Sequence, residues 1–290
     1  MKRIMALMLM LCLLAGVPAL AEAVGNAPLT IAAGEVLAID LDGDGTDENV
    51  TWAMEPGEYD DAMTLTVAAG DGSVQRYATD IIWGESVYVV DIDGDGAQEI
   101  LLTGDVMSDD YYTWCLRWDG AALYEVLFPD GERGENGEGY HKQGYGLVDA
   151  IGDNLLSLSG SQDVLGTWFA TRTLRLTPYD RFEFNDAGLW MRSLDGYEGA
   201  DDDLWEFAAL TVTQSLPYAD EHHHDQTIGT LEPGDRILIY ASDKKEFAYF
   251  ASQDGASGVL NISPNYEQGW GWLVDGIPEE ECFESVPYAD

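Results

Sequence analysis

The chain is poor in basic residues and in cysteine. Its 290 residues include 13 Lys and Arg against 54 Asp and Glu, a formal net charge of −41 at pH 7. Nucleic-acid binding requires clustered Lys and Arg to neutralise phosphates, so this charge excludes it. The same charge disfavours anionic membranes and wall polymers unless a divalent cation bridges them. The three cysteines, one of them in the N-terminal apolar run, are too few for a disulfide framework.

The sequence also lacks the short motifs of common catalytic sites. It contains no G-x-S-x-G elbow, H-E-x-x-H helix, P-loop or G-x-G-x-x-G fingerprint. With 54 acids, some pair will always lie at the separation that glycosidases use, so proximity of carboxylates carries no weight. His141, His222, His223 and His224 have no identifiable Ser or Cys partner. We therefore expect a protein that is not an enzyme.

No stretch is long and apolar enough for a comfortable membrane span of about 20 residues. Lys2 and Arg3 precede an apolar run over residues 4–14, and Ala19-Leu20-Ala21 gives the small-x-small pattern of a signal peptidase site. We expect residues 1–21 to be a signal peptide that is cut after Ala21. The protein is then secreted or loosely associated with the cell surface.

Two stretches place carboxylates at positions 1, 3, 5 and 9 of a loop: D-L-D-G-D-G-T-D-E at residues 40–48 and D-I-D-G-D-G-A-Q-E at residues 91–99. Calcium takes about six to eight oxygens, which alternate acids in a tight turn and the carbonyl at position 7 can supply. Gly45 and Gly96 stand at position 6, where the chain must turn sharply. Position 12 holds Thr51 and Leu102, not the bidentate Glu of an EF-hand. The spacing predicts two calcium loops that are not EF-hands.

Short apolar runs flank both loops. Residues 36–39 and 87–90 precede them, and residues 49–53 and 100–104 follow them, so each loop is predicted to join two strands. The alternative is a solvated acidic turn that binds nothing tightly. Two in-register copies, 51 residues apart from Asp40 to Asp91, argue against coincidence.

The signature D-x-D-x-D-G-x-x-[DE] resembles the FG-GAP/VCBS family of extracellular repeats, which is known from the calcium-binding blades of integrin-type β-propellers. The resemblance implies two calcium sites, each with four carboxylates and one carbonyl. The residues it assigns are Asp40, Asp42, Asp44, Thr46 (carbonyl) and Glu48 in the first site, and Asp91, Asp93, Asp95, Ala97 (carbonyl) and Glu99 in the second.

A third copy, at residues 146–158, keeps the apolar run, a leading Asp149 and the following strand but has lost the carboxylate series. It is predicted to be a structural repeat without calcium. Three such units over residues 27–194, each with three or four antiparallel strands, predict an all-β repeat domain. Because propellers need about four to eight blades to close, we expect an open or incomplete propeller-like stack.

Residues 195–206, where Gly and acids break the apolar pattern, are predicted to be a linker. After it, residues 209–213, 228–240 and 247–250 predict strands of a small barrel. The run G-T-L-x-x-G-D-x-I from Gly229 to Ile237 resembles bacterial SH3-like domains, in which the Gly-Asp turn precedes a central strand. The resemblance implies an SH3-like domain over residues 207–290.

Two features of this second domain have open interpretations. His222, His223 and His224, flanked by acids, suit zinc, nickel or copper, but adjacent residues rarely converge on one ion and a solvated loop is the alternative. Trp270 and Trp272 would share one face of a strand. They would either stack on sugar rings or pack the core of a small barrel.

Together these features predict a secreted, calcium-binding, non-catalytic binding or adhesion protein of the bacterial cell exterior, with a surface glycan, peptide or protein as its partner. One alternative is a glycan-active enzyme on a propeller-like scaffold, which needs a deep cleft with two carboxylates of perturbed pKa. The other is a purely structural, calcium-dependent spacer, which would show no concave or aromatic patch.

Overall fold

The structure is a computed structural model that describes residues 27–56, 61–107, 110–129, 140–185, 188–192, 205–206, 208–267 and 269–288. The expected signal peptide and residues 195–204 of the expected linker lie outside the described residues. Nearly all described elements are β-strands, which confirms the all-β class. Within the described ranges, no helix has the length and apolar character needed to cross a membrane.

The chain divides into two compact units. The described residues of the N-terminal unit belong to Leu20–Gly160 and Arg172–Gly188, and those of the C-terminal unit to Ser161–Thr171 and Leu189–Asp290. Strands β14 (Leu155–Asp163) and β15 (Thr167–Thr177) contribute residues to both units. The division therefore does not coincide with the boundary predicted between residues 194 and 207.

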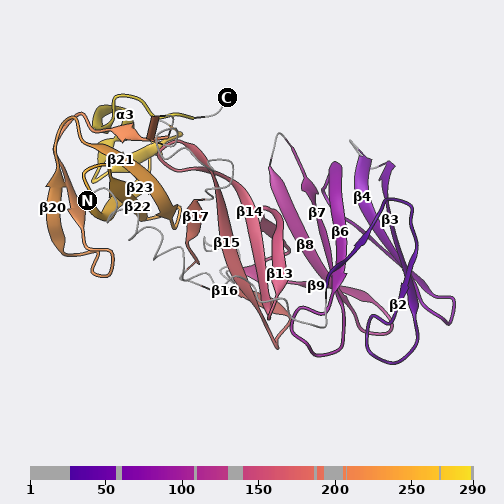
Figure 1. The fold of residues 1–290 in the computed structure, drawn as a ribbon. Coiled ribbons are helices and arrows are strands. Elements are labelled where there is room, and N and C mark those ends of the chain that lie inside the picture. The colour runs from indigo at the N-terminus through magenta and orange to yellow at the C-terminus, as the bar shows by residue number, and fades with distance from the viewer. Residues whose placement is uncertain are drawn as a thin grey trace. The chain divides into compact units, whose positions relative to one another are not determined.

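The N-terminal unit contains three four-stranded antiparallel meanders, one from each predicted copy (Figure 1). The first runs β2-β3-β4-β5, the second β6-β7-β8-β9, and the third β13-β14-β15-β16. The second meander also pairs with β1 and β12, and β10 pairs with β11. The strand bounds are β1 Leu29–Ile31, β2 Leu37–Ile39, β3 Glu48–Pro56, β4 Asp61–Ala68, β5 Val74–Ala78, β6 Trp83–Val90, β7 Glu99–Asp105, β8 Tyr111–Trp118, β9 Leu123–Val126, β10 Phe128–Pro129, β11 Tyr140–His141, β12 Gln143–Tyr145, β13 Leu147–Gly152 and β16 Arg181–Phe184.

The middle meander is buried on both faces. Successive side chains of a strand point to opposite sides of its sheet, and every residue of β7 is buried. Leu102 of β7 packs in a core with Val50 and Leu65 of the first meander. Leu101 packs in a second core with Leu156 and Leu174 of the third. The three copies are therefore stacked through two apolar layers, and Cys115 is a buried member of the second layer, as predicted.

The third copy turns without an acidic loop. Asp153 and Asn154 connect β13 to β14, and both adopt positive φ angles, 53° and 65°, as a tight two-residue hairpin turn requires. The structure thus places a short turn where the other two copies have eight-residue acidic loops.

The C-terminal unit is built on the strand order β17-β21-β22-β23-β19-β20. Strand β18 also pairs with β21, and β24 joins β23 to β25. Among the described residues these pairings form an open sheet, so the expected small barrel is not confirmed. The bounds are β17 Trp190–Arg192, β18 Leu210–Thr211, β19 Leu216–Ala219, β20 Thr227–Leu231, β21 Arg236–Ser242, β22 Phe247–Ser252, β23 Ser257–Pro264, β24 Trp272–Val274, β25 Ile277–Pro278 and helix α3 Glu279–Cys282.

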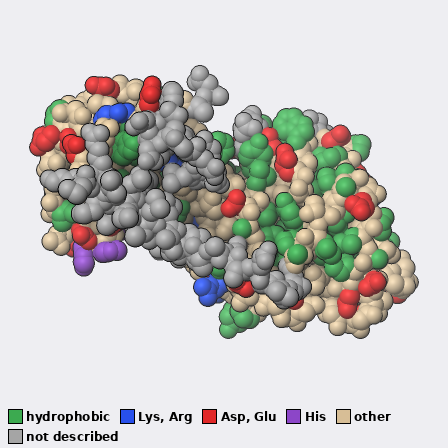
Figure 2. All heavy atoms as spheres, in the orientation of Figure 1, with side chains coloured by type: hydrophobic (Ala, Val, Ile, Leu, Met, Phe, Trp, Pro, Cys, Tyr) green, Lys and Arg blue, Asp and Glu red, His purple; other side chains and the backbone are tan. Residues whose placement is uncertain are grey.

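Acidic side chains are spread over the surface. Figure 2 shows Asp and Glu scattered across the visible face, whereas Lys and Arg appear at few places. This distribution agrees with the net charge of −41. Few basic residues are therefore available to neutralise a buried cluster of acids.

Candidate metal centre

Each acidic loop connects two paired strands, as predicted. Residues 40–47 join β2 to β3, and residues 91–98 join β6 to β7. The glycines at loop positions 4 and 6 have positive φ angles of 75° and 89° in the first loop, and of 75° and 95° in the second. Such angles are strained for residues with a Cβ atom, which explains why glycine stands there.

The first Asp of each loop organises the turn through backbone amides. In the first loop, Asp40 Oδ1 accepts hydrogen bonds from the amides of Gly43 (2.9 Å) and Asp44 (3.1 Å), and Oδ2 accepts one from Gly45 (2.9 Å). The second loop repeats this pattern, with Asp91 bonded to the amides at the same three positions at 2.7, 3.1 and 3.1 Å. Carboxylates that accept backbone bonds are fixed in direction, so the spacing of the acids determines the local fold.

The Glu at position 9 ties each loop to the core. Glu48 Oε2 accepts a hydrogen bond of 3.0 Å from the amide of Leu41, and Leu41 is fully buried in the first apolar layer. Glu99 Oε2 accepts one of 2.7 Å from the amide of Ile92, which is buried in the second layer. The side chain at position 2 therefore anchors the loop while its amide orients the carboxylate at position 9.

Three of the predicted ligands in each loop converge. The carboxylate oxygens of Asp40, Asp42 and Glu48 lie within 4.8 Å of one another, and so do those of Asp91, Asp93 and Glu99. Calcium binds oxygens at about 2.3–2.6 Å, so ligands on opposite sides of the ion lie about 5 Å apart. The three carboxylates of each cluster are therefore close enough to contact one cation together.

The acids at position 5, Asp44 and Asp95, are not members of the two clusters. Asp44 Oδ1 accepts a hydrogen bond from the Thr46 amide at 2.7 Å, and Asp95 Oδ1 accepts one from the Ala97 amide at 2.9 Å. The acids at position 5 therefore brace the end of each loop in this structure. Thr46 and Ala97 take part in these hydrogen bonds of the loops as donors, through their backbone amides.

The pKa of Glu48 in the first loop is raised above its usual value. Burial is the main cause, and repulsion from Asp42, Asp44 and Asp40 adds to it, while the Leu41 amide opposes it. Among the described residues, no Lys or Arg forms an ion pair with this cluster. No basic side chain of the described residues thus neutralises its negative charges.

The second loop differs because Arg117 of β8 reaches it. The guanidinium lies 2.7 Å from Asp95, 2.8 Å from Glu99 and 3.8 Å from Asp93, and its side chain is only 8% exposed. Burial raises the pKa of the Glu99 carboxyl, and the Ile92 amide and Arg117 oppose that rise. Burial also acts to raise the pKa of Asp95. The Ala97 amide and Arg117 have the larger effect, so the pKa lies below its usual value.

Sequence reasoning missed Arg117. The available signal was a single charge inside the apolar run Trp114-Cys115-Leu116-Arg117-Trp118, where every residue is buried. A buried arginine in a strand requires acidic partners, but the sequence does not say which of 54 acids they are.

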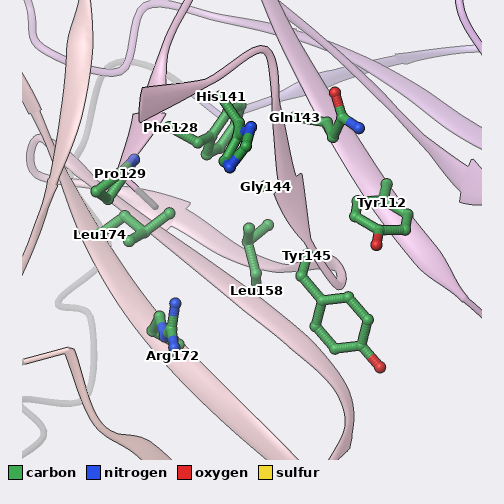
Figure 3. Close-up of a pocket in the computed structure, with 10 residues that line it drawn as sticks. All are labelled: Tyr112, Phe128, Pro129, His141, Gln143, Gly144, Tyr145, Leu158, Arg172 and Leu174. Carbon is green, nitrogen blue, oxygen red and sulfur yellow. The ribbon is translucent and has the colours of Figure 1, made fainter. Parts of the chain in front are cut away.

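A pocket of about 260 Å³ lies in the N-terminal unit (Figure 3). Its described lining residues are Tyr112, Phe128, Pro129, His141, Gln143, Gly144, Tyr145, Leu158, Arg172 and Leu174. Tyr112 and Tyr145 meet edge to face with their ring centroids 5.5 Å apart. The guanidinium of Arg172 lies 4.7 Å from the centroid of the Phe184 ring. The pocket thus combines aromatic faces with polar groups. Its lining residues come from six strands, so no short sequence motif predicts it.

The tryptophan pair of the C-terminal unit does not form a joint face. Trp270 is 68% exposed and packs edge to face on Tyr288, whereas Trp272 is buried and donates a hydrogen bond of 2.7 Å to the Asp163 carbonyl. The expectation assumed a continuous strand, but Gly269 and Gly271 both have φ angles of 80° and β24 begins only at Trp272.

The rings of His223 and His224 have different partners and do not converge. The His223 ring lies 3.2 Å from Asp220, whereas the His224 ring packs against Phe247 with centroids 4.0 Å apart. Of the residues that the structure describes, only the two acidic loops group metal-binding side chains closely.

We compared the chain with models of known families, with curated proteins and with solved structures, and none of them matches. The assignment of function therefore rests on the residues and their geometry.

Proposed function

We propose that the protein is a secreted, calcium-stabilised, non-catalytic binding protein of the bacterial cell exterior, built from FG-GAP/VCBS-like repeats and an SH3-like module. The observation that carries the proposal is the cluster of Asp40, Asp42 and Glu48. Its oxygens lie within 4.8 Å of one another and no described basic side chain neutralises them. Like charges held this close repel unless a cation binds between them.

Calcium is the cation that the chemistry of the site favours. The ligands are all hard oxygens, whereas zinc and copper prefer sites with nitrogen or sulfur. Outside cells calcium is millimolar, so even a site of modest affinity is occupied there. The proposed export and the proposed calcium site therefore support each other.

The pocket supports a binding role over that of a simple spacer. Aromatic faces beside a guanidinium and an amide suit a sugar ring that carries an acidic group. The ten described lining residues include no Asp or Glu, so the pocket offers groups for binding and not the paired carboxylates of glycoside hydrolysis. We assign the ligand contact of the N-terminal unit to this pocket.

The C-terminal unit contributes a second contact surface in this proposal. The run that resembles SH3-like domains contains a turn at Gly234, with a φ angle of 94°, and continues into β21. Strand β21 pairs with β17, β18 and β22, so it is central in its sheet. This placement agrees with the position of the Gly-Asp turn before a central strand in that family.

Thermal melting of the chelated protein tests the calcium role. Millimolar calcium should raise the melting temperature, and Asp42→Asn should remove that rise. Asp47→Asn is the matched control, because Asp47 is an exposed acid of the same loop outside the cluster. An unchanged melting temperature in the wild type would refute the proposal.

Fluorescence titration with glucuronate and glucose tests the binding role. Saturable binding of glucuronate that Tyr145→Ala abolishes and Trp270→Ala leaves intact would support the pocket as the ligand site. If neither sugar binds, the structural spacer becomes the better account of the chain.

A further inference from the structure

We infer that Arg117 takes the place of a calcium ion at the second acidic loop, so that only the first loop depends on calcium. This inference rests on the proposed calcium role of the loops. It concerns a difference between two copies whose signature residues match at every carboxylate position.

Arg117 is held by four carboxylates. Three belong to the second loop, namely Asp93, Asp95 and Glu99, and the fourth is Asp180, whose Oδ1 lies 2.7 Å from Nη1 of Arg117. Asp180 lies in the turn between β15 and β16 of the third copy. The guanidinium is thus fixed from two sides, and it is always protonated, so it forms a permanent cation beside the loop.

Among the described residues, no such cation lies beside the loop of the first copy. Ile100 of β7 pairs with Leu116 of β8, so Arg117 stands one residue further on, opposite Glu99. In the first copy Asn49 pairs with Ala68, and the residue one further on, opposite Glu48, is Ala69. The same place beside the loop therefore holds an arginine in the second copy and an alanine in the first.

The two copies also differ in how many carboxylate oxygens are already engaged. Glu99 Oε2 accepts the Ile92 amide, and its Oε1 forms an ion pair with Arg117 Nε at 2.8 Å without a hydrogen bond. Asp95 uses Oδ1 for the Ala97 amide and Oδ2 for Arg117. In the first loop, described donors contact Oε2 of Glu48 and Oδ1 of Asp44, and none contacts their second oxygens. The first loop keeps oxygens for a metal that the second has committed to arginine.

Electrostatic repulsion prevents a calcium ion and Arg117 from occupying the second loop at the same time. A calcium ion in the second loop would lie within a few ångströms of a buried guanidinium, where like charges repel strongly because little water screens them. Displacing Arg117 would in turn leave a buried cation without partners, which is costly. The arginine therefore holds the second loop in shape and ties it to the third copy at any calcium concentration.

The test is a reciprocal exchange of the two residues. Calcium titrations by calorimetry on the chelated full chain would compare the wild type with Arg117→Ala and with Ala69→Arg. We expect one site in the wild type, lost with Asp42→Asn and unaffected by Asp93→Asn. Ala69→Arg should weaken that site at least about tenfold, because it places a cation beside the first loop.

In Arg117→Ala we expect a second site, which Asp93→Asn then removes. Arg117→Gln, which keeps hydrogen-bond donors at this position, serves if the alanine variant fails to fold. Two wild-type sites of similar affinity, one of them lost with Asp93→Asn, would overturn the inference and leave the calcium role intact. No saturable binding in the wild type or in either Arg117 variant would instead overturn the calcium role itself.

Discussion

The amide of Gln98, in the second acidic loop, donates a hydrogen bond of 2.8 Å to the carbonyl of Leu41 in the first. The carbonyl of Ile92, at the equivalent position of the second loop, accepts one of 3.0 Å from Asn154 in the turn of the third copy. Each turn is therefore bonded to the next one along the stack. The backbone carbonyl at position 2 of each acidic loop thus links that loop to the next turn in the stack.

Removing calcium should consequently loosen the contact between the loops. If calcium orders the first loop, chelation will increase hydrogen exchange at the amide of Gln98, because its acceptor, the Leu41 carbonyl, becomes mobile. The amide of Asn154 should change less, since its acceptor belongs to the loop held by Arg117. Exchange measured by NMR or mass spectrometry with and without calcium checks this, and equal changes at both amides would contradict it.

Calcium binding should weaken on mild acidification. The pKa of Glu48 is raised by burial and by the neighbouring acids, so its carboxyl takes up a proton at a higher pH than an ordinary glutamate does. Calcium must displace that proton, so its affinity falls as pH drops through the raised pKa. Titrations from pH 7 downward should show the loss of affinity beginning above the usual Glu range. A constant affinity down to pH 4.5 would show that Glu48 is not a ligand.

Leu41 should be worth more to stability than its place in a loop suggests. Its side chain is fully buried in the layer between the first two meanders, so Leu41→Ala leaves a cavity and should cost about 2–5 kcal/mol. Val36→Ala is the control, because Val36 is 59% exposed and its truncation should have little effect. Urea unfolding of both variants measures the difference. Equal costs would mean that Leu41 does not anchor the loop.

A side chain at Gly144 should disturb the pocket. A Cβ atom there would lie 2.5 Å from Cδ1 of Phe128 and 2.8 Å from Cδ1 of Leu158, and both neighbours are buried. Phe128 is also stacked on Phe182, which limits its movement. Gly144→Ala should therefore cost about 1–3 kcal/mol through overpacking. Gln143→Ala, one residue earlier, should cost less, and a fully stable Gly144→Ala would contradict the packing described.

The sequence allowed the loops to be predicted because their structure is local. Asp40 and Asp91 bond to amides three to five residues away, so residue spacing alone determines the turn. The strands that flank the loops follow from apolar runs in the same way. The three antiparallel meanders of the repeat region were predictable from the period of the pattern.

What depended on distant contacts was not predictable. Arg117 and its partner Asp180 are 63 residues apart, and no pattern in the sequence links them. The two compact units differ from the predicted boundary, because β14 and β15 contribute residues to both units. The strand that the spacing of Trp270 and Trp272 assumed is interrupted by positive φ angles at Gly269 and Gly271.

The most direct test of the central claim is a calorimetric calcium titration of the chelated protein beside Asp42→Asn and Asp47→Asn. The account predicts saturable binding to the wild type and to Asp47→Asn, and none to the first loop of Asp42→Asn. If the wild type takes up no calcium saturably at millimolar concentration, the loops are acidic turns and the calcium-stabilised binding protein described here is not what this chain forms.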